Sequence, residues 1–187
     1  MNDSKTYVGI IGFAILYAVS VFLCAFLGFL NPVCWVGFPI LAALVGAFSY
    51  FKVASHLQTF GAGMLCALVL AAFLFASGEL KVTEACLMLS AGIVSDIVRM
   101  ALGNKTVEGV SWAYPVLSLG NISWILPLWT RTDWYYVGAI EEMGKDYADG
   151  LMPLASGMSL FIVIVLTLLL AYLGIRLAAR WMKSSLL

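Results

Sequence analysis

Six long apolar runs constrain the fold of this chain more than any other feature. A helix needs about 20 mostly apolar residues to cross the hydrocarbon core of a bilayer. The runs that meet this requirement are residues 8–29, 32–51, 57–76, 83–102, 110–129 and 154–178. Because 63% of the chain is hydrophobic and only 11% is charged, no part of it offers the polar surface that a soluble domain needs. We predict an all-α integral membrane protein, a six-transmembrane-helix bundle that forms a single domain over residues 1–187.

Several functional classes lack support in the sequence. The formal net charge is zero, so no overall field attracts nucleic acid. His56 is the only histidine, and no CxxC pair occurs, so neither a metal centre nor a disulfide framework is expected. The cysteines lie inside apolar runs and are predicted to be small buried hydrophobes: Cys24, Cys34, Cys66 and Cys86. The chain also lacks the Walker A, HExxH and GxSxG motifs, so we expect no catalytic residues and no intrinsic cofactor.

The distribution of Lys and Arg predicts the orientation. With an even number of helices, both termini lie on one side of the membrane. That side would hold seven cations: Lys5, Lys52, Arg99, Lys105, Arg176, Arg180 and Lys183. The other side would hold three: Lys81, Arg131 and Lys145. Because cytoplasmic loops carry the excess of Lys and Arg, we expect cytoplasmic termini and a location in the cell membrane.

The connection over residues 130–153 is the longest polar segment, and it combines aromatic with charged side chains. Within it, apolar positions recur at helical spacing: Val137, Ile140, Gly144, Tyr147 and Leu151. This pattern predicts a short amphipathic helix. Such a helix could form a lid over a cavity between the membrane helices. It could equally lie in the interface beneath a belt of tryptophans and tyrosines.

Candidate ligand contacts cluster on this outer side. Asn121 and Ser123 lie inside the fifth apolar run, where an uncompensated polar group is costly, so they should face protein or a cavity. Glu79 in a short outer loop would suit a cationic or donor-rich group, and the aromatic side chains would stack on a ring-containing ligand. The predicted substrate-binding residues are Trp35, Glu79, Asn121, Trp124, Trp129, Trp134, Tyr135 and Tyr147.

Two further patterns allow both structural and functional interpretations. Ala14 and Ala18 form a small-xxx-small pair, which permits close helix approach either inside the bundle or against a partner subunit. Asp96 and Arg99 are three residues apart, a spacing that lets them pair on one helix face. Their position near the end of the fourth run favours a structural ion pair or a snorkelling arginine over an intramembrane functional site.

Several short motifs occur in an order that resembles a known transporter family. They are Asn31-Pro32, the segment GIVSD at residues 92–96, Leu126-Pro127, the segment GKDYADGL at residues 144–151, and a last helix that runs through Leu173-Gly174 into a basic tail at 176–183. In this order they resemble the substrate-capture S components of energy-coupling-factor (ECF) transporters. The chain is most similar to the Trep_Strep family among them, also called MptD-like.

This resemblance implies a prokaryotic six-helix membrane protein with cytoplasmic termini and an outward-facing pocket. It also implies a membrane scaffold, the T component, and two ATPase subunits that use ATP. Ala14 and Ala18 match the AxxxA-type patch that meets the T component in such families. The implied ligand is vitamin-like or cofactor-like, and haem stays possible despite the absence of an outer histidine. The alternatives are a stand-alone secondary transporter or channel, and a structural membrane assembly protein.

Overall fold

A computed structural model describes residues 3–182, of which no part forms a β-strand, and 86% of the structure is helical. Lys183, one of the cations in the orientation argument, lies outside the described residues. The long helices are α1 (Asp3–Phe26), α2 (Pro32–His56), α3 (Ala62–Ala76), α4 (Val82–Leu102), α5 (Val107–Leu119) and α10 (Gly157–Trp181). The short ones are η1 (Leu27–Phe29), α6 (Ile122–Ile125), α7 (Pro127–Thr130), α8 (Thr132–Met143), α9 (Lys145–Leu151) and η2 (Met152–Leu154).

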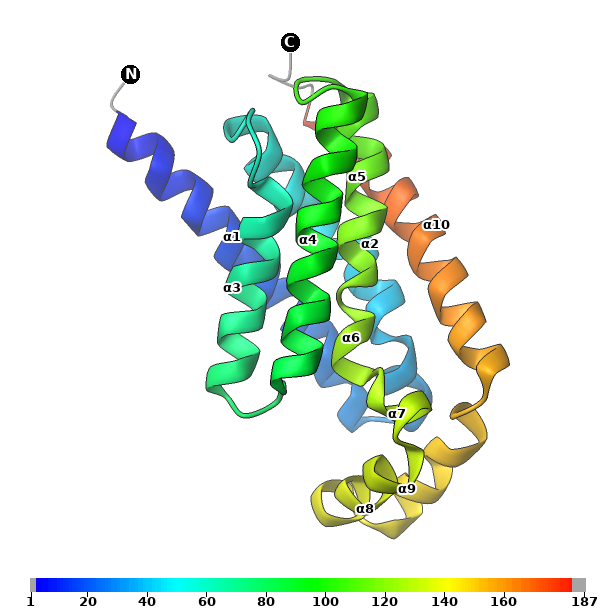
Figure 1. The fold of residues 1–187 in the computed structure, drawn as a ribbon. Helices are drawn as coiled ribbons and strands as arrows, with labels where there is room; N and C mark the ends of the chain where they lie inside the picture. Colours follow the sequence, from blue (N-terminus) through cyan, green and yellow to red (C-terminus); the bar gives the residue numbers. More distant parts are fainter. Residues whose placement is uncertain (1–2, 183–187) are drawn as a thin grey trace.

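The long helices form one bundle, and the chain alternates between its two ends (Figure 1). The start of α1, the end of α10 and the α2–α3 and α4–α5 turns lie at one end. The α3–α4 turn and the pair α8–α9 lie at the opposite end, which we call the lid end. Helix α2 packs against both α1 and α10, while α4 lies between α3 and α5.

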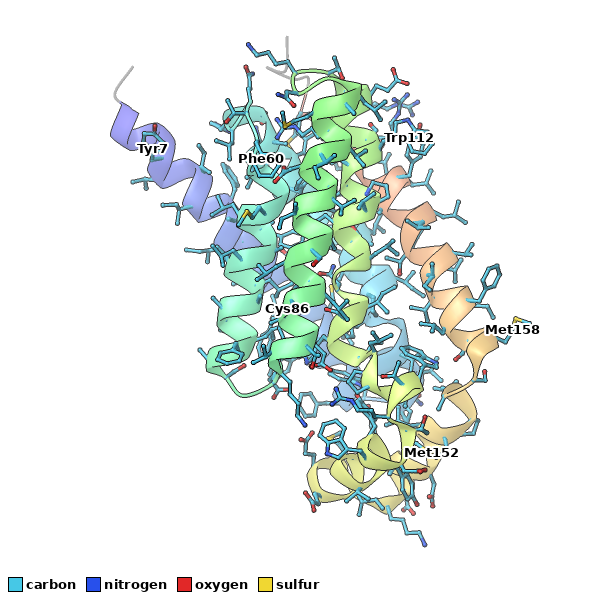
Figure 2. All side chains as sticks on the ribbon, viewed as in Figure 1. Tyr7, Phe60, Cys86, Trp112, Met152 and Met158 are labelled. Atoms are coloured by element: carbon cyan, nitrogen blue, oxygen red, sulfur yellow. The ribbon has the colours of Figure 1, made fainter. Side chains whose placement is uncertain are left out.

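Among the described residues, four helical segments are long and apolar enough to cross a membrane: Tyr7–Phe29, Pro32–His56, Val82–Leu102 and Gly157–Trp181. Large apolar side chains such as Tyr7, Trp112 and Met158 project from the outer surface of the bundle (Figure 2). A surface of this kind suits lipid, which solvates apolar groups as well as a protein core does. Helix α3 has only 15 residues, and the fifth predicted span is divided. Membrane crossing by these two segments, and therefore the count of six, stays a prediction.

Side-chain capping sets the start of several helices. Asn31 accepts a hydrogen bond from the Val33 amide at 2.8 Å, and Pro32 occupies the first turn of α2, where no amide hydrogen is needed. Thr106 caps α5 in the same way through the Gly109 amide. Helix α2 continues to His56, five residues beyond its predicted end, and α3 begins at Ala62 instead of residue 57. The turn between α2 and α3 therefore comes later in the sequence than the apolar runs indicate.

The predicted helix over 110–129 is divided into α5, α6 and α7. Between Leu117 and Leu126 the backbone uses i→i+3 hydrogen bonds, including Gly120 N to Leu117 O at 2.9 Å and Asn121 N to Ser118 O at 3.1 Å. These bonds wind the chain more tightly than an α-helix does. Pro127 has no amide hydrogen, so the backbone lacks a hydrogen-bond donor at this position. The interruption carries Trp124 to the lid end of the bundle interior, where it is 7% exposed.

Ala14 and Ala18 are buried inside the bundle, with 0% and 4% of their surfaces exposed. They belong to the core that α1 shares with its neighbours. The expectation that they form a docking surface for a partner is therefore corrected: the small side chains pack internally. The same principle operates between α3 and α4, where a Cβ on Gly92 would come within 2.9 Å of the Gly63 carbonyl oxygen.

Asp96 and Arg99 do not form the expected ion pair within the described residues. Both are 1% exposed, but each binds backbone groups instead. Asp96 accepts hydrogen bonds from the amides of Gly63 and Met64 at 2.9 Å, which caps the start of α3. The Arg99 guanidinium donates to carbonyl oxygens in both turns at this end of the bundle: Ala54, Leu57 and Asn104. The two charges thus hold the α2–α3 and α4–α5 turns together.

Candidate functional site

A cavity of about 620 Å³ opens at the lid end, between the bundle and α8–α9. Its size falls within the roughly 300–1,000 Å³ that small-molecule sites occupy. Its lining comes from α1, η1, α2, the α3–α4 turn, α4 and the segments from α6 to α9. The aromatic and charged residues that line it are Phe22, Phe26, Phe29, Trp35, Glu79, Lys81, Glu84, Trp124, Arg131, Trp134, Tyr135, Glu142 and Tyr147.

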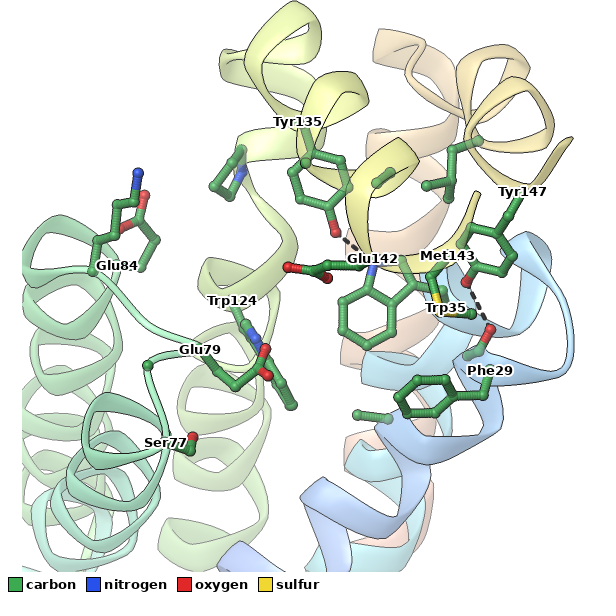
Figure 3. Close-up of a pocket in the computed structure, with 18 of the residues that line it drawn as sticks. Phe29, Trp35, Ser77, Glu79, Glu84, Trp124, Tyr135, Glu142, Met143 and Tyr147 are labelled. Carbon is green, nitrogen blue, oxygen red and sulfur yellow. Dashed lines mark hydrogen bonds between the residues drawn. The ribbon is translucent and has the colours of Figure 1, made fainter. Parts of the chain in front are cut away.

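Two tryptophans form adjoining walls of the cavity. The rings of Trp35 and Trp124 have centroids 5.5 Å apart and lie at 78° to each other (Figure 3). Phe22 lies parallel to Trp124, with the ring centroids 6.3 Å apart. Phe38 packs behind both tryptophans and supports them from the core. The walls are therefore aromatic faces held in place by buried neighbours.

Gly28 fixes the position of Trp35. A Cβ at this residue would overlap the Trp35 ring, so only glycine allows η1 to pass so close. The Trp35 indole also donates a 2.5 Å hydrogen bond to the Tyr135 hydroxyl on α8. The wall is thus attached both to the bundle and to the segment that covers the cavity.

The segment α8–α9 is fastened to the bundle by tyrosine hydrogen bonds. Besides the bond between Trp35 and Tyr135, the Tyr147 hydroxyl donates to the Gly28 carbonyl oxygen at 2.6 Å. Burial raises the pKa of Tyr147 to about 12, and burial also raises the pKa of Tyr135. Both phenols therefore stay protonated at neutral pH, and the Tyr147 hydroxyl keeps the hydrogen that it donates to Gly28, while the Tyr135 hydroxyl accepts from Trp35. The two bonds act as latches that join the cover to the rim.

The cover differs from the predicted single amphipathic helix. It breaks at Gly144, whose φ of 89° favours glycine, and forms two helices that pack on each other. Val137 and Ile140, expected on the inner face, are exposed. On α8 the positions that reach the cavity are instead 134, 135, 138, 139, 142 and 143. The predicted inner face is correct on α9, where Tyr147 and Leu151 line the cavity.

Both cations in the lining already have partners inside the protein. Arg131 forms an ion pair with Glu84, which is buried at the start of α4. Lys81 lies over Trp134, with its Nζ 3.6 Å from the ring centroid, an arrangement that attracts a cation to the π face. Arg131 approaches the same ring at 5.2 Å. One side of the cavity mouth thus holds an ion pair and a lysine that lies on an aromatic face.

Two carboxylates in the lining have no such partner. Glu79 and Glu142 make no ion pair within residues 3–182. Their side chains point into the same space beside Trp124 and Trp35 (Figure 3). Partial burial raises the pKa of Glu79, the neighbouring charge of Glu142 raises it further, and the nearby Trp124 indole lowers it in part. The cavity therefore combines an aromatic interior with uncompensated negative charge.

Six of the eight predicted binding residues line this cavity: Trp35, Glu79, Trp124, Trp134, Tyr135 and Tyr147. The other two do not reach it. Asn121 is 1% exposed within the core, where its Oδ1 accepts a hydrogen bond from the Tyr17 hydroxyl at 3.3 Å. Trp129 ties α7 to the last helix, because its indole donates to Leu154 O and to Ser159 Oγ. Both side chains point away from the cavity because the interruption between α5 and α7 determines how this segment packs.

Sequence reasoning missed part of the lining. Phe22, Phe26 and Phe29 lie within one apolar run and carry no signal that separates them from lipid-facing residues. Glu142 is one of several acids in the 130–153 segment. Glu84 could have been singled out, because a carboxylate at the start of an apolar run needs a partner, and Arg131 supplies it.

No group of three potential metal ligands occurs among the described residues. The profile of a family described as "Hypothetical bacterial integral membrane protein (Trep_Strep)" matches residues 4–184. No curated protein and no solved structure matches the chain.

Proposed function

This chain belongs to the Trep_Strep family of bacterial integral membrane proteins, and we propose that it captures a small molecule as the S component of an ECF-type importer. The cavity of about 620 Å³ beneath α8–α9 is the observation that carries this proposal. It has the size, aromatic walls and few polar groups of a ligand site. The motifs that resemble S components extend along most of the same chain.

The proposed capture step uses the cover as a lid. A ligand enters at the lid end when the latches at Tyr135 and Tyr147 open, and it settles against Trp35 and Trp124. Closure restores the two hydrogen bonds and excludes water, which strengthens every polar contact inside. Because both latch partners lie on the cavity rim, ligand release and lid opening are coupled.

In this proposal the lid end faces outward and both termini are cytoplasmic, as the distribution of Lys and Arg favours. The six crossings consist of α1, α2, α3, α4, the α5–α7 segment and α10. The protein itself is not an enzyme and carries no cofactor. A T component and two ATPase subunits supply the energy from ATP, and the ligand is vitamin-like or cofactor-like.

The proposed contact with the T component cannot use Ala14 and Ala18, because both are buried. The side of α1 that faces away from the bundle instead offers Gly12, where an added Cβ would meet no atom within 4 Å. Exposed Ile11 and Ile15 border it. A partner helix that meets this side of α1 would pack against a flat apolar strip.

Tryptophan fluorescence of the purified chain tests the capture step, because Trp35 and Trp124 line the cavity. Titration with a panel of vitamins and cofactors, haem included, should change the emission saturably with one compound class. A structural assembly protein would bind none of them. Trp112, which is exposed on the outer surface, supplies the control: Trp112→Phe should leave the ligand-dependent change intact, whereas Trp124→Phe should reduce it.

A further inference from the structure

The charge balance of the cavity identifies the class of molecule that it accepts. Its lining contains three carboxylates and two cations, a difference of one formal charge. The pairing is uneven, however, because Arg131 is committed to Glu84, and Lys81 lies on the face of Trp134. The ion pair leaves Glu79 and Glu142 without a cationic partner among the described residues.

These two carboxylates come from distant parts of the chain. Glu79 lies in the α3–α4 turn and Glu142 in the last turn of α8, yet they are close enough for the charge of one to raise the pKa of the other. Both side chains are exposed in this structure, so water reaches them, but two like charges in one cavity repel each other. A cation placed between them would offset that repulsion. Within residues 3–182, no side chain pairs with them to supply it.

The aromatic walls favour the same kind of ligand. Trp35 and Trp124 pack edge to face at 78°, and both line the cavity, so a molecule beside them contacts the aromatic surface of both rings. Each face carries the negative lobe of the ring quadrupole, which attracts cations and repels anions. Lys81 on Trp134 shows this attraction within the same cavity.

We propose that the cavity binds an organic cation, whose charged group lies between Glu79 and Glu142 and whose apolar or planar body lies against Trp35 and Trp124. This inference rests on the proposed capture function, and it specifies the chemical class of the captured molecule. A protonated amine, a quaternary ammonium group or a cationic heterocycle meets the description. A carboxylate or phosphate ligand does not.

Thermal unfolding of the full chain in detergent tests this class with mixtures of metabolites, so the ligand need not be identified first. The probe is an aqueous yeast extract freed of macromolecules and separated by ion exchange at neutral pH into cationic, neutral and anionic fractions. We expect the cationic fraction to raise the unfolding temperature and the other two to leave it unchanged. Stabilisation by the anionic or neutral fraction alone would overturn the inference and leave the capture function standing. If no fraction stabilised the chain, both proposals would fail.

Charge-neutral variants identify the residues that bind the cationic fraction. Glu79→Gln and Glu142→Gln keep the shape of each side chain, and either should weaken apparent binding of the cationic fraction about tenfold or more, since it removes one charge from a partly desolvated contact. Glu141→Gln is the matched control, because Glu141 is a neighbouring acid on α8 that does not line the cavity. Equal binding by all three variants would contradict the assignment of the cation to this pair of carboxylates.

Discussion

The buried charges at one end of the bundle differ from the two exposed carboxylates in the cavity at the other end. At the end opposite the lid, Asp96 and Arg99 are buried, and backbone amides and carbonyls bind them. At the lid end, Glu79 and Glu142 point into an open cavity, with no cation paired to them among the described residues. A charge that the protein satisfies by itself has a structural role, because it holds elements together. A charge left unsatisfied beside aromatic walls is available to a ligand.

Removal of the Arg99 side chain should produce the largest effect on stability. Arg99→Ala leaves three carbonyl oxygens of two turns without their donor and empties a fully buried volume. Breakage of a buried charged network typically costs about 3–5 kcal/mol. We expect a loss of that size in the unfolding free energy, measured by denaturant titration in mild detergent. Lys145→Ala, at an exposed cation of the lid end, should cost far less. Equal losses would remove the distinction between the two ends.

Filling the cavity should abolish binding without loss of stability. Gly138 lines the cavity, and a Cβ there would meet no atom within 4 Å, so Gly138→Leu places a side chain in open space. We expect at least a hundredfold weaker binding, equivalent to about 2.7 kcal/mol or more. Gly37→Leu, at a second unobstructed glycine outside the cavity, is the control and should bind normally. Isothermal titration of both variants makes the comparison.

The pH dependence of binding should differ in sign from that of stability. The raised pKa of Glu79 means that its charged form is disfavoured in the folded, empty protein, so this carboxyl adds stability as pH falls through its folded pKa. Binding of a cation needs the charged form and should weaken over the same pH range, which lies above the usual titration of glutamate. The other titratable groups of the lining are Lys81, Glu84, Arg131, Tyr135, Glu142 and Tyr147. Glu79→Gln should flatten both profiles in this range.

Loss of one latch should have the smallest effect. Tyr147→Phe removes only the hydroxyl that donates to Gly28 O, a bond worth about 1 kcal/mol. We expect ligand dissociation to accelerate about fivefold, measured by stopped-flow tryptophan fluorescence. Tyr136→Phe breaks a bond to Asp149 within the cover itself and should not change dissociation from the closed site. If both variants behaved alike, the latch would have no special role in retention.

The sequence predicts the parts of this structure that depend on local pattern. Apolar length identified α1, α2, α4 and α10, and Asn31-Pro32 marked the start of α2 within one residue. Aromatic and acidic content marked the lid end, and most of the residues singled out there do line one cavity. Local sequence pattern does not predict where a side chain points when that depends on residues distant in the sequence. Asn121 and Trp129 turn away from the cavity because the α5–α7 segment is interrupted, and Ala14 and Ala18 face the core because α1 packs against it.

The inner face of the cover shows the same limit. A single helical repeat through Val137 and Ile140 predicts one continuous face, but the positive φ at Gly144 restarts the helix and changes which residues point inward. Tyr135 and Glu142 then reach the cavity in place of Val137 and Ile140. Hydrophobic periodicity could not reveal this change, because aromatic and acidic side chains replace aliphatic ones on the surface that lines the cavity.

Uptake by reconstituted proteoliposomes tests the proposed role of this chain, because an S component captures its ligand and depends on other subunits to deliver it. The measurement compares vesicles that hold this chain alone with vesicles that also hold a T component and two ATPases, each loaded with ATP and offered the cationic extract fraction. We expect that the chain alone binds ligand but accumulates none, and that uptake requires the partners and ATP hydrolysis. Accumulation by the chain alone would contradict it and establish a stand-alone transporter.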